Sequence, residues 1–233
     1  MRKLACLFVL LPLLVAGCHG GLGAQIKGSG KRELQKRDVA PFTSISTDGA
    51  FTIEVTCQKD LSLEVEGDDN VLGLVTSEVK GNVLRLKNTK NYSTSEPVKF
   101  KISVPNLEGF SLNGAGRIDI KGMNNEKFEI DSNGAPTIFV SGTTKIIDIG
   151  VNGAGTINTT KLRASRGVVE ANGAARVDLD VADQLDATVS GPSTITYRGA
   201  PVVNKTVHGP GKVERRSSEG AWRIQTAGAS HPS

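Results

Sequence analysis

The sequence is poor in the side chains on which most enzymes and metal sites depend. It has three histidines and three cysteines, and aromatic residues make up only 4% of its 233 residues. His19 and His231 lie near the two ends, and His208 stands in a turn motif. Their spacing from the cysteines fits no zinc site, and no converging set of titratable groups is evident. We therefore predict no catalytic residues, no metal and no cofactor.

Long hydrophobic runs are also scarce, and the only candidate lies at the N-terminus. Leu4–Val15 is apolar but too short to span a bilayer, and it follows two basic residues, as in an export signal. It ends in Val15-Ala16-Gly17-Cys18, which is typical of a bacterial lipobox. We predict that residues 1–17 are a lipoprotein signal peptide and that Cys18 is lipidated. A plain signal peptide cleaved after Ala24 is the alternative, but Leu22 is too large for that site.

Processing at Cys18 changes both the cysteine count and the charge. Cys6 would leave with the signal, so Cys57 would be the one remaining thiol, and no intrachain disulfide could form. Cys57 lies in an alternating strand pattern, which favours a buried, inert thiol. His19 rather than Asp follows the lipidated cysteine, which favours the outer membrane of the bacterial cell envelope. The excess of basic residues falls from four to two, and no basic stripe with aromatics is present, so nucleic acid is not expected as a partner.

The mature chain divides into three parts by composition. Residues 18–37 comprise the lipidated cysteine and a Gly-rich, then charged, segment, which predicts a flexible tether. Residues 38–214 alternate apolar and polar side chains, which predicts strands throughout. Residues 215–233 read as a C-terminal tail or cap, in which Trp222 could cover the last strands.

Glycine is the abundant residue, and it marks an internal repeat. The motif Leu112-Asn-Gly-Ala-Gly-Arg-Ile118 recurs five times in related form, and its glycines are spaced 20, 19, 20, 18 and 18 residues apart. Including an earlier copy, the predicted structural turn residues are Gly49, Asn113, Gly114, Asn133, Gly134, Asn152, Gly153, Asn172, Gly173, Gly191 and Gly209. Looser turns lie halfway between them, including Lys121–Asn124 and Ser141–Thr144.

Two all-β architectures can produce this repeat of tight and loose turns. One is an antiparallel meander with Asn-Gly hairpins. The other is a single-stranded, two-sheet β-solenoid with Gly-centred tight turns at an 18–20-residue period, in which equivalent residues stack. We favour the solenoid, because a meander gives no reason for the same turn sequence at every second corner. Stacking would place one β-branched row in the interior: Ile118, Ile138, Ile157, Val177, Ile195 and Val213. The rows on either side are polar and would form a solvated face.

The first part of the domain is less regular and reads as entry coils and a cap. Residues 70–79 are expected to form a helical turn or an irregular loop, and residues 88–96 a polar excursion. Strands are expected around them, including Phe51–Val55 and Val98–Val104.

The order of these motifs resembles a known family. Arg37-Asp-Val-x-x-Phe-x-Ser-Ile45, Gly49-Ala-Phe-x-Ile-Glu-Val55 and Gly67-Asp-Asp-Asn70 are followed by Val98-Lys-Phe-Lys-Ile-Ser-Val-Pro-Asn-Leu107, which leads into the first complete repeat. Over Arg37–Glu214 the chain is similar to the putative auto-transporter adhesin, head GIN domain family. That resemblance implies a β-superhelix of two sheets with Gly-centred turns, carried on a lipoprotein or a secreted chain, and an adhesion role without catalytic residues.

A candidate binding face follows from the stacked polar rows. Thr156, Asn158, Arg176 and Asp178 fall close together on neighbouring coils and could hold a glycan or a protein surface, although a salt-bridged solvated face also fits them. We predict a non-catalytic binding or adhesion domain on a lipid-anchored envelope protein. A polysaccharide lyase-like enzyme and a purely structural envelope protein remain the alternatives, and the oligomeric state is open.

Overall fold

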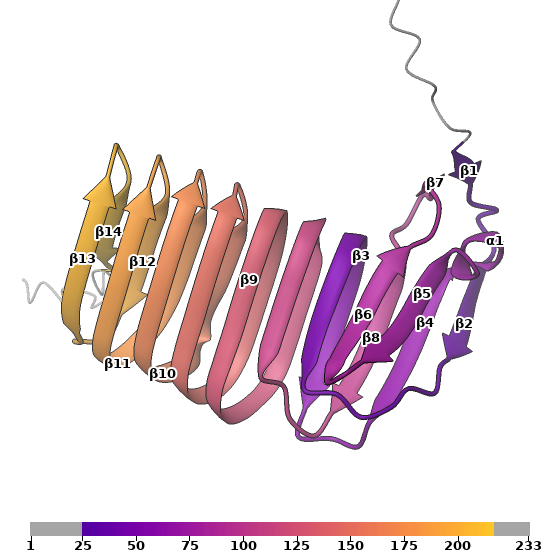
Figure 1. Ribbon diagram of the computed structural model, residues 1–233, viewed down its shortest axis with the longest axis horizontal. Coiled ribbons are helices and arrows are strands. Elements are labelled where there is room, and N and C mark those ends of the chain that lie inside the picture. The colour runs from indigo at the N-terminus through magenta and orange to yellow at the C-terminus, as the bar shows by residue number, and fades with distance from the viewer. Residues whose placement is uncertain (1–24, 217–233) are drawn as a thin grey trace, which may run out of the picture.

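The computed structural model describes residues 25–216. The expected signal peptide, the lipidation site at Cys18 and the tail containing Trp222 lie outside the described residues. Within 25–216 the chain is almost entirely β-structure, with one short helix, α1 (Asp69–Leu72). Its parts line up along one long axis, with the N-terminal strands at one end and the C-terminal strands at the other (Figure 1).

The strands fall into two groups along this axis. The N-terminal group is β1 (Ile26–Lys27), β2 (Arg32–Lys36), β3 (Ser44–Cys57), β4 (Ser62–Asp68), β5 (Val75–Lys80), β6 (Val83–Asn88), β7 (Tyr92–Ser93) and β8 (Lys99–Val104). The C-terminal group is β9 (Gly109–Gly153), β10 (Thr156–Gly173), β11 (Arg176–Ser190), β12 (Thr194–Arg198), β13 (Val202–His208) and β14 (Lys212–Arg215).

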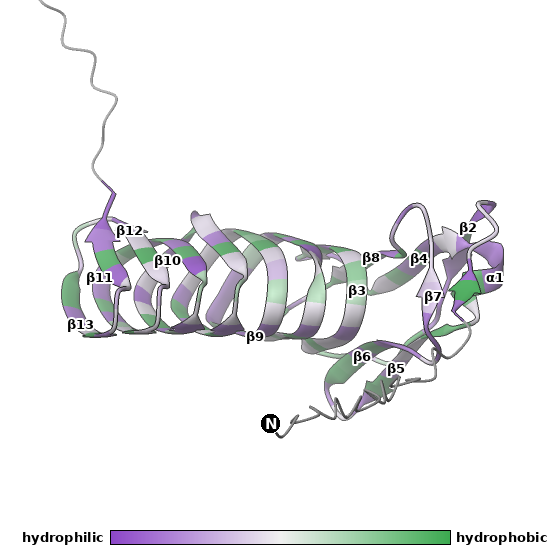
Figure 2. Cartoon of the chain, turned by 90° about the horizontal axis from the view of Figure 1, so that it is seen from above, coloured by the Kyte–Doolittle hydropathy of each residue, from purple (hydrophilic) through white to green (hydrophobic). Residues whose placement is uncertain are grey.

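A 12-stranded mixed sheet joins nearly all of these strands, in the order β14-β12-β11-β10-β9-β3-β8-β4-β2. From β3 to the C-terminal end of this order the strands pair in parallel: β3 with β9, β9 with β10, β10 with β11, β11 with β12, and β12 with β14. An antiparallel meander would pair these strands in the opposite sense, so that alternative is wrong. The longest strands continue around bends in the chain, and each such winding lies against the next (Figures 1 and 2).

The register places equivalent repeat residues side by side. Ile138 pairs with Ile157, which pairs with Val177, which pairs with Ile195. These four side chains and Ile118 are 0% exposed. The predicted interior row is therefore confirmed as buried. Because side chains alternate between the two faces of a strand, burying this row leaves its polar neighbours on the outside.

The tight-turn glycines stack on one another through their backbones. Gly134 and Gly153 have φ values of 144° and 142°, a region that favours glycine. A Cβ atom on either would collide with the carbonyl oxygen of the preceding turn glycine, Gly114 or Gly134 respectively. Beside this stack the Asn172 side-chain amide donates to Asn152 Oδ1 at 3.1 Å, the stacked-amide contact expected from the repeat.

The first part of the domain mixes parallel and antiparallel pairing. β6 and β8 lie parallel to β3, as entry coils would. In contrast, β4 pairs antiparallel with both β8 and β2, and β5 pairs antiparallel with β6. The expected helical turn is α1, and the polar excursion contains β7.

The structure differs from the expected flexible tether over residues 26–36. β1 pairs with β7, and β2 pairs with β4 along the outer edge of the sheet. The charged and polar residues of Arg32-Glu33-Leu34-Gln35-Lys36 are typical of a linker, but a charged strand is also a means of protecting a sheet edge. Leu34 is 53% exposed on this edge. None of the described helices could cross a membrane.

Candidate functional site

The residues of the predicted binding face lie together as expected, but their polar groups are largely hydrogen-bonded to other residues of the same domain. Thr156 pairs with Arg176 and Asn158 pairs with Asp178 across β10 and β11, so the four residues do lie together. Asn158 Oδ1 accepts hydrogen bonds from the backbone N–H and the hydroxyl of Thr160, at 3.1 and 2.7 Å. Its amide oxygen is therefore already engaged by its own strand.

Asp178 is buried, which the expectation of a solvated face did not foresee. Its side chain is only 5% exposed. Arg176 donates to both carboxylate oxygens, at 2.9 and 3.1 Å, and Arg216 donates to Oδ1 at 3.2 Å. Two guanidinium groups thus cover the carboxylate, and the hydrogen bond to Asp178 raises the pKa of Arg176. This arrangement is a structural ion-pair cluster rather than an open ligand site.

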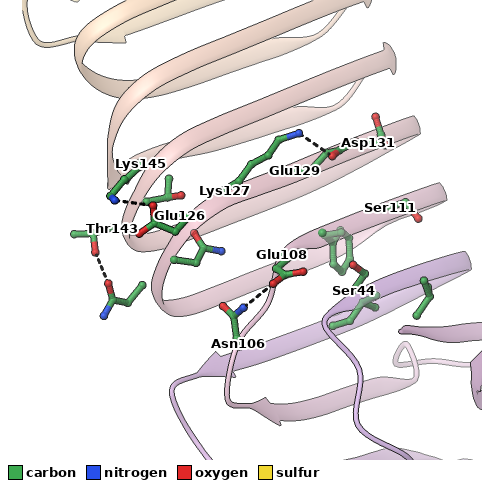
Figure 3. A pocket seen from close by; sticks show the side chains of 17 residues that line it. Ser44, Asn106, Glu108, Ser111, Glu126, Lys127, Glu129, Asp131, Thr143 and Lys145 are labelled. Carbon is green, nitrogen blue, oxygen red and sulfur yellow. Dashed lines mark hydrogen bonds and ion pairs between the residues drawn. The ribbon is translucent and has the colours of Figure 1, made fainter. Parts of the chain in front are cut away.

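An opening lies away from this face, where β3, the 105–108 loop and the loose turns of β9 meet. It is an open groove of about 940 Å³. Its lining includes Ser44 of β3 and Asn106 and Glu108 of the loop, together with side chains at and beside two successive loose turns of β9, within residues 124–131 and 143–145 (Figure 3). We call this opening the loose-turn groove.

Backbone hydrogen bonds align the segments that form the floor of the groove. The Glu108 N–H donates to the Thr43 carbonyl at 2.7 Å, and the Glu129 N–H donates to the Glu108 carbonyl at 2.9 Å. The apolar side chains of Ile45 and Phe110, which are paired across β3 and β9, close the bottom and are 1% and 2% exposed. Residues far apart in the sequence are thus held at adjacent rungs of one rigid sheet.

The rim of the groove carries several kinds of polar side chain. The Asn106 amide donates to Glu108 Oε1 at 3.1 Å, and Thr143 donates to Asn124 Oδ1 at 3.4 Å. Lys145 pairs with Glu126 at 2.6 Å (Figure 3). Amides, hydroxyls, carboxylates and ammonium groups therefore alternate around the opening, so it offers both hydrogen-bond donors and acceptors.

The electrostatic balance of the groove is acidic. Lys127 lies 3.3 Å from Glu129 and 3.5 Å from Asp148, and the hydrogen bond to Glu129 raises its pKa. Asp131 has neither a salt bridge nor a side-chain hydrogen bond among the described residues. Burial, followed by the nearby charges of Glu129 and Asp148, raises the pKa of this carboxyl. Asp131 is therefore held in an environment that disfavours its charged form.

The Asp131→Asn variant is expected to be slightly more stable than the wild type at pH 7. A raised folded-state pKa favours folding below the ordinary pKa of aspartate, and that contribution is lost as pH rises through the folded-state value. The ionised carboxylate is thus a cost at neutral pH that the amide avoids. Because the group is largely solvated, we expect less than about 1 kcal/mol. Urea denaturation at pH 7 and near pH 3 should show a gain that shrinks at the lower pH; a gain that grows on acidification would contradict this sign.

Sequence reasoning located the loose turns but not the groove. The segments Lys121–Asn124 and Ser141–Thr144 are the expected loose turns, yet no motif marks Glu108 or Asp131 as their neighbours. The available signal was the stacking itself, since equivalent turns of a stacked repeat must gather at one edge.

The Cys57 thiol is free and buried, as predicted. Cys57 is 4% exposed, and its Sγ lies 3.4 Å from Met123 Sδ. Burial raises the pKa of this thiol to about 11, so the reactive thiolate is scarce at neutral pH. No group of three or more His, Cys, Asp or Glu side chains between residues 25 and 216 is arranged to hold a metal ion.

Comparison with known proteins agrees with this architecture. A family model described as "Putative auto-transporter adhesin, head GIN domain" matches residues 41–201, more than half of the chain. The chain belongs to this family. No curated protein matches the chain at a significant level. The head GIN domain match covers β3 to β12 and includes every segment that lines the loose-turn groove.

Solved structures share the fold of this head GIN domain. The crystal structure of a putative adhesin from Bacteroides fragilis is 24% identical, with a TM-score of 0.68 over 82% of this chain and 100% of that one. A putative adhesin from Parabacteroides distasonis is 21% identical, with a TM-score of 0.53 over 83% of this chain and 100% of that one. At these identities the likeness establishes the fold alone.

Proposed function

We propose that this head GIN domain is a non-catalytic, adhesin-type binding module of the bacterial cell envelope, and that its loose-turn groove binds a glycan. The observation that carries the proposal is the groove itself, an open space of about 940 Å³ with a polar rim on a rigid sheet. The family description, an adhesin, supports a binding role over a catalytic one.

The chemistry of the rim favours a hydroxyl-rich ligand. Sugar hydroxyls donate and accept hydrogen bonds at once, so they need a site that offers both. Asn106 and Asn124 supply amides, Glu108 and Asp131 supply carboxylate acceptors, and Thr143 supplies a hydroxyl. The length of the groove across successive windings suits a chain of several sugar units better than a single one.

The scaffold that presents this groove is, in our proposal, a two-sheet β-solenoid with a period of 18–20 residues. The parallel pairing of equivalent residues, such as Thr137 with Thr156 and Thr156 with Arg176, supports it. In such a scaffold each winding contributes equivalent positions at a spacing of roughly 4.8 Å, so a regular polymer could meet several rungs at once.

We also propose that the mature chain is held in the membrane by lipid on Cys18, with the outer membrane as its location. The lipobox of residues 15–18 and His19 after it support this placement. The described domain begins at residue 25, so a short segment would separate it from the lipid. Glycan or protein surfaces outside the membrane would then be within reach of the groove.

A glycan array probed with the chain from residue 19 onward tests the ligand. We expect the doubly substituted Asn106→Ala/Glu108→Ala groove variant to lose about tenfold or more in affinity for any glycan that the wild type binds. Each lost hydrogen bond is worth about 0.5–1.5 kcal/mol. The matched control is Lys161→Ala/Glu170→Ala, two exposed residues of β10 outside the groove, which should bind like the wild type.

The other outcomes separate the alternatives. Loss of binding in an Arg176→Ala/Asp178→Ala variant but not in the groove variant would move the site to the predicted face of β10 and β11. Binding to envelope proteins but to no glycan would replace the ligand class. Release of unsaturated products from polyuronates would identify a lyase and overturn the non-catalytic assignment. Failure to bind either class would favour a structural role.

A further inference from the structure

The C-terminal end of the domain presents an open sheet edge. β13 pairs with β11 on one side, and no strand between residues 25 and 216 pairs with its other side. Three large hydrophobic residues between residues 25 and 216 are exposed, and two of them lie on this strand: Val202 is 70% exposed and Val207 is 39% exposed. An unpaired edge with apolar side chains is a liability that folded proteins usually cover.

The inward-facing residues of β13 are less buried than their partners in β11. Val203, Lys205 and Val207 pair with Leu185, Ala187 and Val189 of β11, which are 0%, 4% and 0% exposed. Val203 is partly buried and still packs against the core, whereas Lys205 and Val207 are exposed. Among residues 25–216, no further strand covers the interior of the last winding.

The sequence after residue 216 contains a glycine at the spacing of the repeat. Gly228 follows Gly209 by 19 residues, within the spacing of the earlier turn glycines. At that offset Trp222 and Ile224 take the inward positions of Val203 and Lys205, while Arg223 takes an outward one. An offset of 18 would turn Trp222 outward and Arg223 inward, because a one-residue slip reverses every side chain.

The position of Arg216 also suits a further winding. The Arg216 N–H donates to the Tyr197 carbonyl at 2.8 Å, so residue 216 stands beside the end of β12. In the preceding winding three residues, 199–201, separate β12 from β13. Four residues, 217–220, separate Arg216 from Ala221, and they include Gly220, a residue common in turns.

We propose that residues 221–226, Ala-Trp-Arg-Ile-Gln-Thr, add to the free edge of β13 as a parallel strand in this 19-residue register. Trp222 and Ile224 then cover the open interior of the last winding, and Arg223 and Gln225 face water. The occupant of the edge is thus a segment of the same chain, and the surface it closes is that of β13. This inference is independent of the groove and its ligand.

Fluorescence tests the proposal directly, because Trp222 is the single tryptophan of the chain. In the chain from residue 19 onward we expect blue-shifted emission, with acrylamide quenching several-fold weaker than in the urea-unfolded protein. Val203→Asp, which places a charge under Trp222, should shift the emission to the red and restore quenching. Val202→Asp changes the adjacent outward side chain and should leave both unchanged. Emission at the unfolded position in the wild type would overturn the proposal, as would insensitivity to Val203→Asp.

Cross-linking tests the register. With Asn204→Cys and Arg223→Cys the two thiols would lie on adjacent parallel strands, within reach of a disulfide, whereas Asn204→Cys with Gln225→Cys would be two residues out of step. We expect rapid oxidation to an intrachain disulfide only in the first pair. Equal yields in both pairs would overturn the register, and a disulfide-linked dimer, or emission that shifts blue only as concentration rises, would assign the edge to a second copy.

Discussion

Gly134→Ala is expected to destabilise the domain by about 3 kcal/mol or more, the largest effect of any single-methyl change considered. The φ of Gly134 is 144°, and its Cβ atom would collide with the carbonyl oxygen of Gly114. That oxygen belongs to the backbone of the neighbouring turn, which is itself held in the stack, so it has no free direction in which to move. Urea denaturation followed by circular dichroism would measure the loss.

Gly30→Ala is the matched control for this change. Gly30 also has a positive φ, 79°, but no atom lies within 4 Å of the position that its Cβ would take. The conformational cost of alanine there is about 1–2 kcal/mol without any collision. Because the φ of Gly134 is also less accessible to alanine than that of Gly30, the excess cost at Gly134 combines the close approach of the stacked turns with a larger backbone cost. Equal losses in the two variants would show that the stack contributes nothing beyond its backbone angles.

The turn stack and the interior row were predictable because they repeat. Once Gly114, Gly134 and Gly153 recur at nearly constant spacing, the alternation of side chains decides which of their neighbours face inward. Burial of Ile138 and Ile157 followed from that parity without any knowledge of the partner strands. A local pattern was sufficient here because each winding meets a near-copy of itself.

The N-terminal strands were not predictable in the same way. β2 has only Leu34 as an apolar residue, and it is paired along β4, residues 62–68, by backbone hydrogen bonds that leave no trace in composition. Its place at the edge is explained by nonlocal geometry, since β4 needs a partner on its outer side. A charged five-residue segment offers no periodicity that would distinguish such a strand from a linker.

The same limit applies to the candidate sites. The row containing Asp178 was correctly placed next to the interior row, but its burial depends on Arg216, which lies 38 residues further along the chain. The loose-turn groove depends on Glu108, in a loop that belongs to no repeat, meeting turns that do. The alternation of side chains along a strand predicts which face a residue lies on. It does not predict which long side chains or loops from elsewhere in the chain cover that face.

Phe100→Ala is expected to cost about 3–5 kcal/mol, because it empties the core where the N-terminal strands join the stacked windings. Phe100 of β8 is 0% exposed and packs edge-on against Phe51 of β3, with ring centroids 5.2 Å apart and an interplanar angle of 86°. The aromatic pair adds a specific contact to the lost buried area. Chemical denaturation should show a lower midpoint, and amide exchange should show loosening of β8 and β4 first.

Phe139→Ala removes the same side chain from the outside of the sheet and serves as the comparison. Phe139 is only partly buried in an otherwise polar outward row, with the Arg117 guanidinium carbon 4.7 Å from its ring centroid. Loss of this cation–π contact and of some covered surface should cost about 1 kcal/mol. If the two variants were equally unstable, the interior would not be the main source of cohesion between windings. If Phe100→Ala alone loosened β4 while the C-terminal windings kept their protection, the stack would be stable without its N-terminal cover, and each winding would depend chiefly on its immediate neighbours.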